Sequence, residues 1–246
     1  MARPLTAVAH RGDPYRHREN TLPSLRSALE RGADAVEVDV RLTRDGVPVL
    51  LHDHTLERLW GHDRPVSSLT AAGLRDLTGG GVPLLARALE VTAGHRVLLD
   101  LPGAVGTPGA LRRVLGTVRE TGAEDRVYWS GSASTLLALR AAAPSAELAL
   151  TWTTSVPPRA GLLAAVRPRW LNYRFGLVTG ELVRRLHAEG YLVSAWTADT
   201  RRSMRRLAAA GVDSVTTNRI DVLAAVRDAV RDAVRDVPRP VPEGAP

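Results

Sequence analysis

The stretch Ala35-Val-Glu-Val-Asp-Val-Arg-Leu42 alternates apolar and polar side chains, which predicts a β-strand with two different faces. We expect its apolar side chains to face covering helices, whereas Glu37 and Asp39 point into the interior of the fold. Two neighbouring carboxylates in a poorly solvated interior need a positive charge to balance them. A structural network with Arg11 or Arg41 could supply that charge, but a divalent metal bound through oxygen atoms is the better interpretation.

Strand-like and helix-like segments alternate on both sides of this stretch over almost the whole chain. The strand-like runs are Thr6–His10, Ala35–Leu42, Val47–His52, Arg96–Leu101, Val127–Ser130, Glu147–Trp152, Trp170–Tyr173, Leu192–Thr197 and Asp213–Thr217. Several of the amphipathic stretches between them end in glycine, the residue favoured just after a helix C-terminus. This repetition predicts an α/β fold, a TIM (β/α)8 barrel rather than an open sheet. Neither of the common glycine-rich phosphate loops occurs in the sequence.

A hairpin explains why there is one strand-like run too many for such a barrel. Asp45-Gly46 lies between two apolar runs, which is a strong signal for a two-residue turn. This turn makes Val47–His52 the antiparallel partner of the preceding strand and sets Asp39 opposite His52. The irregular segment that follows the third strand-like run, from about residue 53 to 81, is expected to form a small insertion on the barrel.

The barrel domain is expected to span residues 1–237. Near its end, Ala-Val-Arg-Asp occurs three times between Ala225 and Asp236, which predicts a helix that we expect to cover the bottom of the barrel. Residues 238–246 contain four prolines and are expected to be a disordered tail.

Composition excludes several classes of protein. The chain has no cysteine, so disulfides and thiolate sites are impossible, and any metal must be held by carboxylates, histidines or water. Its net charge is +7, but the basic residues are spread along the chain and aromatic residues make up 4%, which argues against nucleic-acid binding. No apolar run is long enough to span a membrane, and the first residues do not resemble a signal peptide, so a cytoplasmic location is expected.

A third carboxylate joins the first two by the same alternation. In Arg96–Leu101, the side chains of Val97 and Leu99 form the outer face, so Asp100 points inward. Asp100 lies near the C-terminal end of its strand, where barrel enzymes have their active sites, although a carboxylate there could instead cap a helix.

His10 and His52 end two of the strand-like runs. A lone histidine is more often structural, but two at strand ends suit a general acid and a general base. A serine hydrolase is disfavoured because the sequence lacks a G-x-S-x-G motif. A glycosidase is disfavoured because Glu37 and Asp39 lie on one strand, an awkward arrangement for flanking a sugar.

In combination, these residues resemble the glycerophosphodiester phosphodiesterase family. The matching stretches are Ala9-His-Arg-Gly12, Glu19-Asn-Thr21, Gly32-Ala-Asp-Ala-Val-Glu-Val-Asp39, Asp45-Gly-Val-Pro-Val49, His52-Asp53, Ala195-Trp-Thr-Ala-Asp199 and Gly211-Val-Asp213. The resemblance implies a TIM barrel that hydrolyses a glycerophosphodiester to glycerol 3-phosphate and an alcohol with one divalent cation, calcium or magnesium. It assigns the acid/base pair to His10 and His52, metal ligands to Glu37 and Asp39, and substrate contacts to Arg11 and Trp196.

The chain departs from the family pattern in two places. The family usually has Glu-x-Lys where this chain has Asp100-Leu-Pro102, and it often has Asp where Asn218 follows the last strand. Asp100 can still bind the metal, whereas Pro102 supplies no cation. The alternative is a non-catalytic or altered-specificity relative that binds a phosphate ligand, but the intact His10 and His52 argue against it. The expected partner is a small-molecule phosphodiester, and both the oligomeric state and the nucleophile, water or a substrate hydroxyl, stay open.

Overall fold

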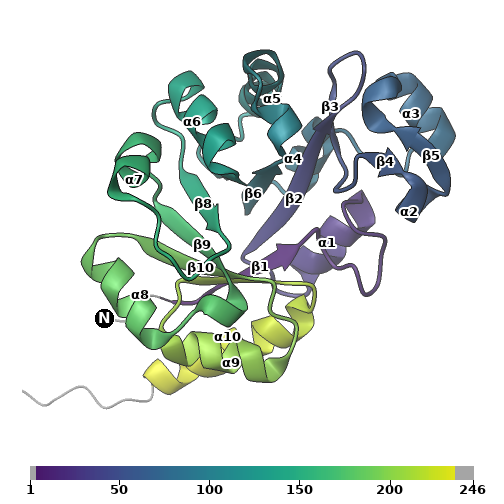
Figure 1. Cartoon of the computed structure of the whole chain (residues 1–246). Helices are drawn as coiled ribbons and strands as arrows, with labels where there is room; N and C mark the ends of the chain where they lie inside the picture. The colour runs from purple at the N-terminus through teal and green to yellow at the C-terminus, as the bar shows by residue number, and fades with distance from the viewer. Residues whose placement is uncertain (1–3, 236–246) are drawn as a thin grey trace, which may run out of the picture.

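The computed structural model describes residues 4–235, which form a closed barrel of parallel strands surrounded by helices (Figure 1). In chain order, the barrel strands are β1 (Thr6–His10), β2 (Ala35–Leu42), β6 (Arg96–Leu101), β7 (Val127–Gly131), β8 (Leu148–Trp152), β9 (Trp170–Arg174), β10 (Leu192–Trp196) and β11 (Ser214–Thr217). β1 pairs with β2 on one side and with β11 on the other, which closes the barrel. The predicted TIM barrel is confirmed, and the predicted tail at 238–246 lies outside the described residues.

Each barrel strand is followed, directly or after an insertion, by a helix on the outside of the barrel. These helices are α1 (Leu22–Glu30), α4 (Leu85–Val91), α5 (Pro108–Glu120), α6 (Ala133–Ala142), α7 (Ala160–Val166), α8 (Gly180–Ala188), α9 (Arg201–Ala210) and α10 (Ile220–Arg235). The 3₁₀ turns η2 (Gly103–Gly106) and η3 (Phe175–Leu177) precede α5 and α8. Five of the helices begin after a hydroxyl side chain that accepts a hydrogen bond from the first turn: Thr21, Thr107, Ser132, Thr179 and Thr200.

The two faces of the barrel strands bury different kinds of residue. Val36, Val38 and Leu99 point outward and are buried in the main apolar core under the helices. A second apolar cluster fills the interior toward the N-terminal ends of the strands: Leu98, Tyr128, Ala149, Trp170 and Leu192. Inward-facing polar side chains are therefore left to gather at the C-terminal ends of the strands.

The bottom of the barrel is closed by a polar cluster rather than by the last helix. Arg96 donates to Glu147 at 2.8 Å and lies over the ring of Tyr128, and Trp170 Nε1 donates to the same glutamate oxygen at 2.6 Å. The expectation that the C-terminal helix covers this end is wrong. α10 packs against β1, β11 and α9, because a helix that follows the last strand returns along the outside of the barrel.

The hairpin after β2 is present, but its register differs from the expected one by one residue. β3 (Pro48–Leu50) pairs with the end of β2, and Leu51 N–H donates to Asp39 O at 3.1 Å. Asp39 therefore lies opposite Leu51 rather than His52. The reason is a three-residue turn in which Gly46 has a φ of +77°, in place of the expected two-residue turn.

A small unit with its own apolar core follows the hairpin and lies beside it, outside the barrel (Figure 1). It contains β4 (Thr55–Leu56), α2 (Glu57–Trp60), β5 (His62–Pro65), η1 (Val66–Ser68) and α3 (Ala71–Thr78). Its core consists of Val49, Leu51, Leu56, Val66, Leu74 and Val82. This separate packing explains why the segment lacks the strand–helix alternation of the barrel. Within residues 4–235, no helix is both long enough and apolar enough to cross a membrane.

The turn between β1 and α1 brings its backbone close to the first turn of the helix. Arg11 and Gly12 have φ values of +59° and +89°. Asp13 N–H donates to Ser24 Oγ at 2.7 Å, and this hydroxyl donates to Arg11 O at 3.0 Å. A Cβ atom on Gly12 would lie 2.3 Å from Ser24 Oγ and 2.6 Å from the Ser24 carbonyl carbon. Both the positive φ and the lack of space require glycine here.

We predict that Gly12→Ala lowers the free energy of unfolding by about 2–5 kcal/mol, because a left-handed residue costs about 1–2 kcal/mol and overpacking about 1–3 kcal/mol. Gly190→Ala is the matched control, since Gly190 has a φ of +87° but nothing within 4 Å of its added Cβ. Urea unfolding measures both losses. Equal losses in the two variants would contradict the steric argument.

Candidate active site

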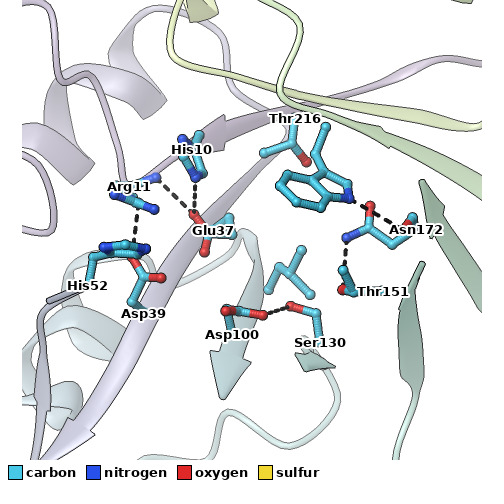
Figure 2. A pocket seen from close by; sticks show the side chains of 12 residues that line it. His10, Arg11, Glu37, Asp39, His52, Asp100, Ser130, Thr151, Asn172 and Thr216 are labelled. Atoms are coloured by element: carbon cyan, nitrogen blue, oxygen red, sulfur yellow. Dashed lines mark hydrogen bonds and ion pairs between the residues drawn. The ribbon is translucent and has the colours of Figure 1, made fainter. Parts of the chain in front are cut away.

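A cavity of about 220 Å³ lies at the C-terminal ends of the barrel strands (Figure 2). All seven residues selected from the sequence line it: His10, Arg11, Glu37, Asp39, His52, Asp100 and Trp196. They come from β1 and the turn after it, from β2, β6 and β10, and from the segment after β3, so the barrel brings together residues that are far apart in the chain. Their chemical roles remain predictions.

Three carboxyl groups form the acidic side of the cavity. Glu37 and Asp39 lie on the inner face of β2 with 5% of each residue exposed, and Asp100 pairs with Asp39 across the β2–β6 ladder. Burial, together with the charges of Asp39 and Asp100, raises the pKa of Glu37 well above its usual value. Burial also raises the pKa of Asp100, although Ser130 donates a 2.6 Å hydrogen bond to its carboxylate.

Arg11 places a positive charge inside this acidic cluster. Its Nε lies 3.0 Å from Asp39 Oδ2, its Nη1 donates to Glu19 at 2.9 Å, and its backbone N–H donates to Glu37 Oε2 at 3.1 Å. Arg41, the other arginine considered from the sequence, donates instead to a backbone carbonyl of the hairpin. An arginine network is therefore present for Asp39, whereas no ion pair among the described residues joins a guanidinium to Glu37 or Asp100, which feel the arginines only at longer range.

His10 lies at the end of β1 with its ring fixed at one nitrogen. Its Nδ1 is 2.8 Å from Asn218 Oδ1, and its Nε2 faces the cavity, 3.8 Å from Glu37 Oε2. The side chain is mostly buried, and burial together with the positive charge of Arg11 lowers the pKa of His10. Both effects favour the neutral form of the ring.

His52 has a different partner at the same ring nitrogen. Its Nδ1 lies 2.7 Å from the carboxylate of Asp53, which also accepts a 2.6 Å hydrogen bond from Arg58 Nε. The hydrogen bond from Arg58 lowers the pKa of Asp53 to about 2, so this carboxylate stays ionised. Arg58 also donates to Glu19 at 2.6 Å, which links α2 to the turn that carries Arg11.

The far side of the cavity is uncharged, and apart from Trp196 its residues were not identified from the sequence. Asn172 receives a 2.7 Å hydrogen bond from Ser194 and donates to Thr151 at 3.3 Å, and Trp196 Nε1 donates to the Asn172 backbone carbonyl at 3.3 Å. Thr151 and Asn172 line the cavity (Figure 2). Trp196 lines it as well. The available signal was the same alternation that identified Asp100, since Thr151, Asn172 and Ser194 are polar residues at inward positions of largely apolar strands.

The acidic side of the cavity has the donor chemistry of a hard divalent cation, because carboxylate oxygens are the ligands that calcium and magnesium prefer. Burial, and after it the neighbouring charges of Asp39 and Asp100, raise the pKa of Glu37, so an ionised Glu37 is costly there unless a further positive charge is bound. As the side chains stand in residues 4–235, no three His, Asp or Glu groups converge closely enough to hold an ion together. Asp39 contacts Arg11 and Asp100 accepts a hydrogen bond from Ser130, so both side chains are oriented toward protein partners in this structure. The carboxylate oxygens themselves are of the type that fits a divalent cation.

Comparison with known proteins identifies the family. Residues 10–222 match the glycerophosphoryl diester phosphodiesterase family. The chain belongs to this family. A glycerophosphodiester phosphodiesterase of Caldanaerobacter subterraneus is 27% identical over 230 residues, which cover 88% of this chain and 95% of the relative. A Mycobacterium tuberculosis protein named "Probable glycerophosphodiester phosphodiesterase 2" is 31% identical over 240 residues, 89% of each chain.

Solved structures share the fold. A phosphodiesterase of Oleispira antarctica, in complex with the product sn-glycerol-3-phosphate, superposes with a TM-score of 0.84 at 23% identity and covers 92% of this chain and 97% of its own. A glycerophosphodiester phosphodiesterase of Thermotoga maritima gives a TM-score of 0.78 at 22% identity, with 90% and 98% covered. At these identities the structures support the barrel architecture.

We predict that Glu37→Gln stabilises the metal-free protein at neutral pH. Because the pKa of Glu37 is raised in the folded state, the folded state binds its proton more tightly than the unfolded chain does. Stability is then lost as pH rises from the usual value of 4.5 toward the raised pKa, and the amide removes this loss. Urea unfolding at a series of pH values measures it. Glu30→Gln, at an exposed glutamate, is the control, and an identical pH dependence in wild type and Glu37→Gln would refute the buried-charge argument.

Proposed function

We propose that this pocket hydrolyses a glycerophosphodiester to glycerol 3-phosphate and an alcohol. The observation that carries the proposal is the pair His10 and His52, which line one cavity with Nδ1 bonded to Asn218 and Asp53 respectively, so that Nε2 is left for a substrate. A protein that only binds a phosphate ligand has no need for such a pair. The sn-glycerol-3-phosphate bound to the Oleispira antarctica phosphodiesterase supports the same product class.

The surroundings of the two histidines suit them to different steps. His10 is mostly buried, which favours its neutral form, and its Nε2 faces the cavity, so we assign it the acceptance of a proton from the nucleophile. His52 has its Nδ1 against the ionised carboxylate of Asp53, which orients its ring, so we assign it the donation of a proton to the leaving alkoxide. The pair thus supplies both proton transfers of a phosphodiester hydrolysis.

The other side chains of the cavity bind the substrate and the cation in this proposal. Arg11 contacts a phosphate oxygen, and Trp196 forms the wall on the glycerol side. Glu37, Asp39 and Asp100 would hold one divalent cation, calcium or magnesium. When bound, that cation supplies positive charge for the phosphate oxygens. We propose a cytoplasmic location for the reaction, as expected from the sequence.

The substrate assignment predicts release of glycerol 3-phosphate from at least one of glycerophosphocholine, glycerophosphoethanolamine, glycerophosphoglycerol and glycerophosphoinositol. Activity is expected to vanish after exhaustive chelation and metal-free dialysis and to return with calcium or magnesium, because the three carboxylates repel an anionic substrate without a cation. An enzyme-coupled assay of glycerol 3-phosphate measures both effects. Full turnover without metal would refute the metal assignment. Phosphodiester binding without turnover on any substrate would favour a binding protein.

The histidine roles predict that His10→Ala and His52→Ala each lower kcat about 10²- to 10⁴-fold with little change in KM. A nitrophenyl diester has a leaving group that needs no protonation, so it should restore turnover in His52→Ala and not in His10→Ala. His95→Ala, at a half-buried loop histidine that does not line the cavity, is the control. Rescue of His10→Ala instead would reverse the two roles.

A further inference from the structure

Asn218 connects the ring of His10 to the carboxylate of Asp199. Asn218 Oδ1 lies 2.8 Å from His10 Nδ1, and Asn218 Nδ2 donates to Asp199 Oδ2 at 2.8 Å. Asp199 is itself held through its other oxygen, which accepts from Thr217 Oγ1 at 3.0 Å and from the Asn218 backbone N–H at 2.8 Å. The two residues come from the loops after β10 and β11, which are neighbours in the barrel.

This connection determines which way the Asn218 amide faces. An amide can present either its oxygen or its nitrogen to a histidine, and the two orientations demand opposite ring tautomers. An ionised carboxylate only accepts hydrogen bonds, so Asp199 requires the amide nitrogen on its side. The amide oxygen is then directed at His10 Nδ1, and that ring nitrogen must carry the hydrogen.

We propose that Asp199 is a positioning residue that acts through Asn218 to hold neutral His10 as the Nδ1–H tautomer. The inference rests on the proposed function, in which His10 Nε2 is the atom that receives the proton. With the amide reversed, Nε2 would carry the hydrogen and would have no lone pair for the nucleophile's proton. Asp199 therefore controls a catalytic atom that it does not touch.

The tautomer also explains why an asparagine serves at this position. His52 obtains an acceptor for its Nδ1–H directly from the carboxylate of Asp53, whereas His10 obtains one from an amide whose direction a second carboxylate sets. Positions 199 and 218 together need one amide and one carboxylate. Exchanging the two residues keeps the same chain of hydrogen bonds, because an aspartate at position 218 accepts from His10 Nδ1 and an asparagine at position 199 donates to that aspartate.

The test combines ring ¹⁵N NMR with kinetics. Protein labelled with ¹⁵N-histidine is measured at a pH where the rings are neutral, and the His10 signals are assigned by their absence in His10→Gln. We expect wild type to carry the His10 hydrogen on Nδ1. Asp199→Ala should give a mixture of tautomers and a fall in kcat of about 10- to 100-fold with KM nearly unchanged. The exchange Asp199→Asn/Asn218→Asp should restore the Nδ1–H tautomer and most of kcat.

Thr217→Val is the matched control. It removes one hydrogen bond from Asp199 but leaves the contact between Asp199 and the Asn218 amide, so the tautomer and kcat should stay as in wild type. A His10 hydrogen on Nε2 in wild type, or an unchanged tautomer in Asp199→Ala, would overturn the proposal, and so would a folded exchange variant that fails to restore the tautomer. The NMR measurement needs no substrate, so it remains decisive even if glycerophosphodiesters are not hydrolysed.

Discussion

Burial of two carboxylates on the inner face of β2 is the constraint on which the rest of the site depends. Glu37 and Asp39 are almost fully enclosed, and Asp100 adds a third carboxyl group across the ladder. Arg11 supplies a positive charge to this cluster. It lies in a turn with positive φ, and the next residue, Gly12, has no room for a side chain. One guanidinium leaves the cluster short of positive charge. That shortfall makes the cavity suitable for a cation and an anionic substrate.

The insertion after the hairpin contributes to this electrostatic arrangement. Arg58 of α2 bonds both Asp53, which holds His52, and Glu19, which holds Arg11. An element outside the barrel therefore tethers two residues of the cavity through a single guanidinium. On the opposite side, Asn218 supports His10 by an uncharged hydrogen bond. The two histidines thus face the same cavity in different electrostatic surroundings, as an acid and a base require.

The barrel and the seven selected residues followed from alternation, strand ends and motif resemblance, because burial on one face of a strand leaves a clear mark in sequence. The register of the hairpin could not be predicted in this way, because a glycine with positive φ allows turns of two or three residues and nothing in the local sequence distinguishes them. The support of His10 could not be foreseen from Asn218 alone, because its amide orientation depends on Asp199 from another loop. The uncharged wall around Asn172 was accessible in principle, as inward polar residues on apolar strands, but such residues carry no motif.

Calorimetric titration of calcium or magnesium into the metal-free protein tests the central claim most directly, namely that the carboxylates of β2 and β6 carry more negative charge than Arg11 balances. The account predicts saturable binding of one cation per chain, loss of that binding in Glu37→Gln, and unchanged binding in Glu30→Gln. Absence of saturable binding, or binding of equal affinity in Glu37→Gln, would contradict it.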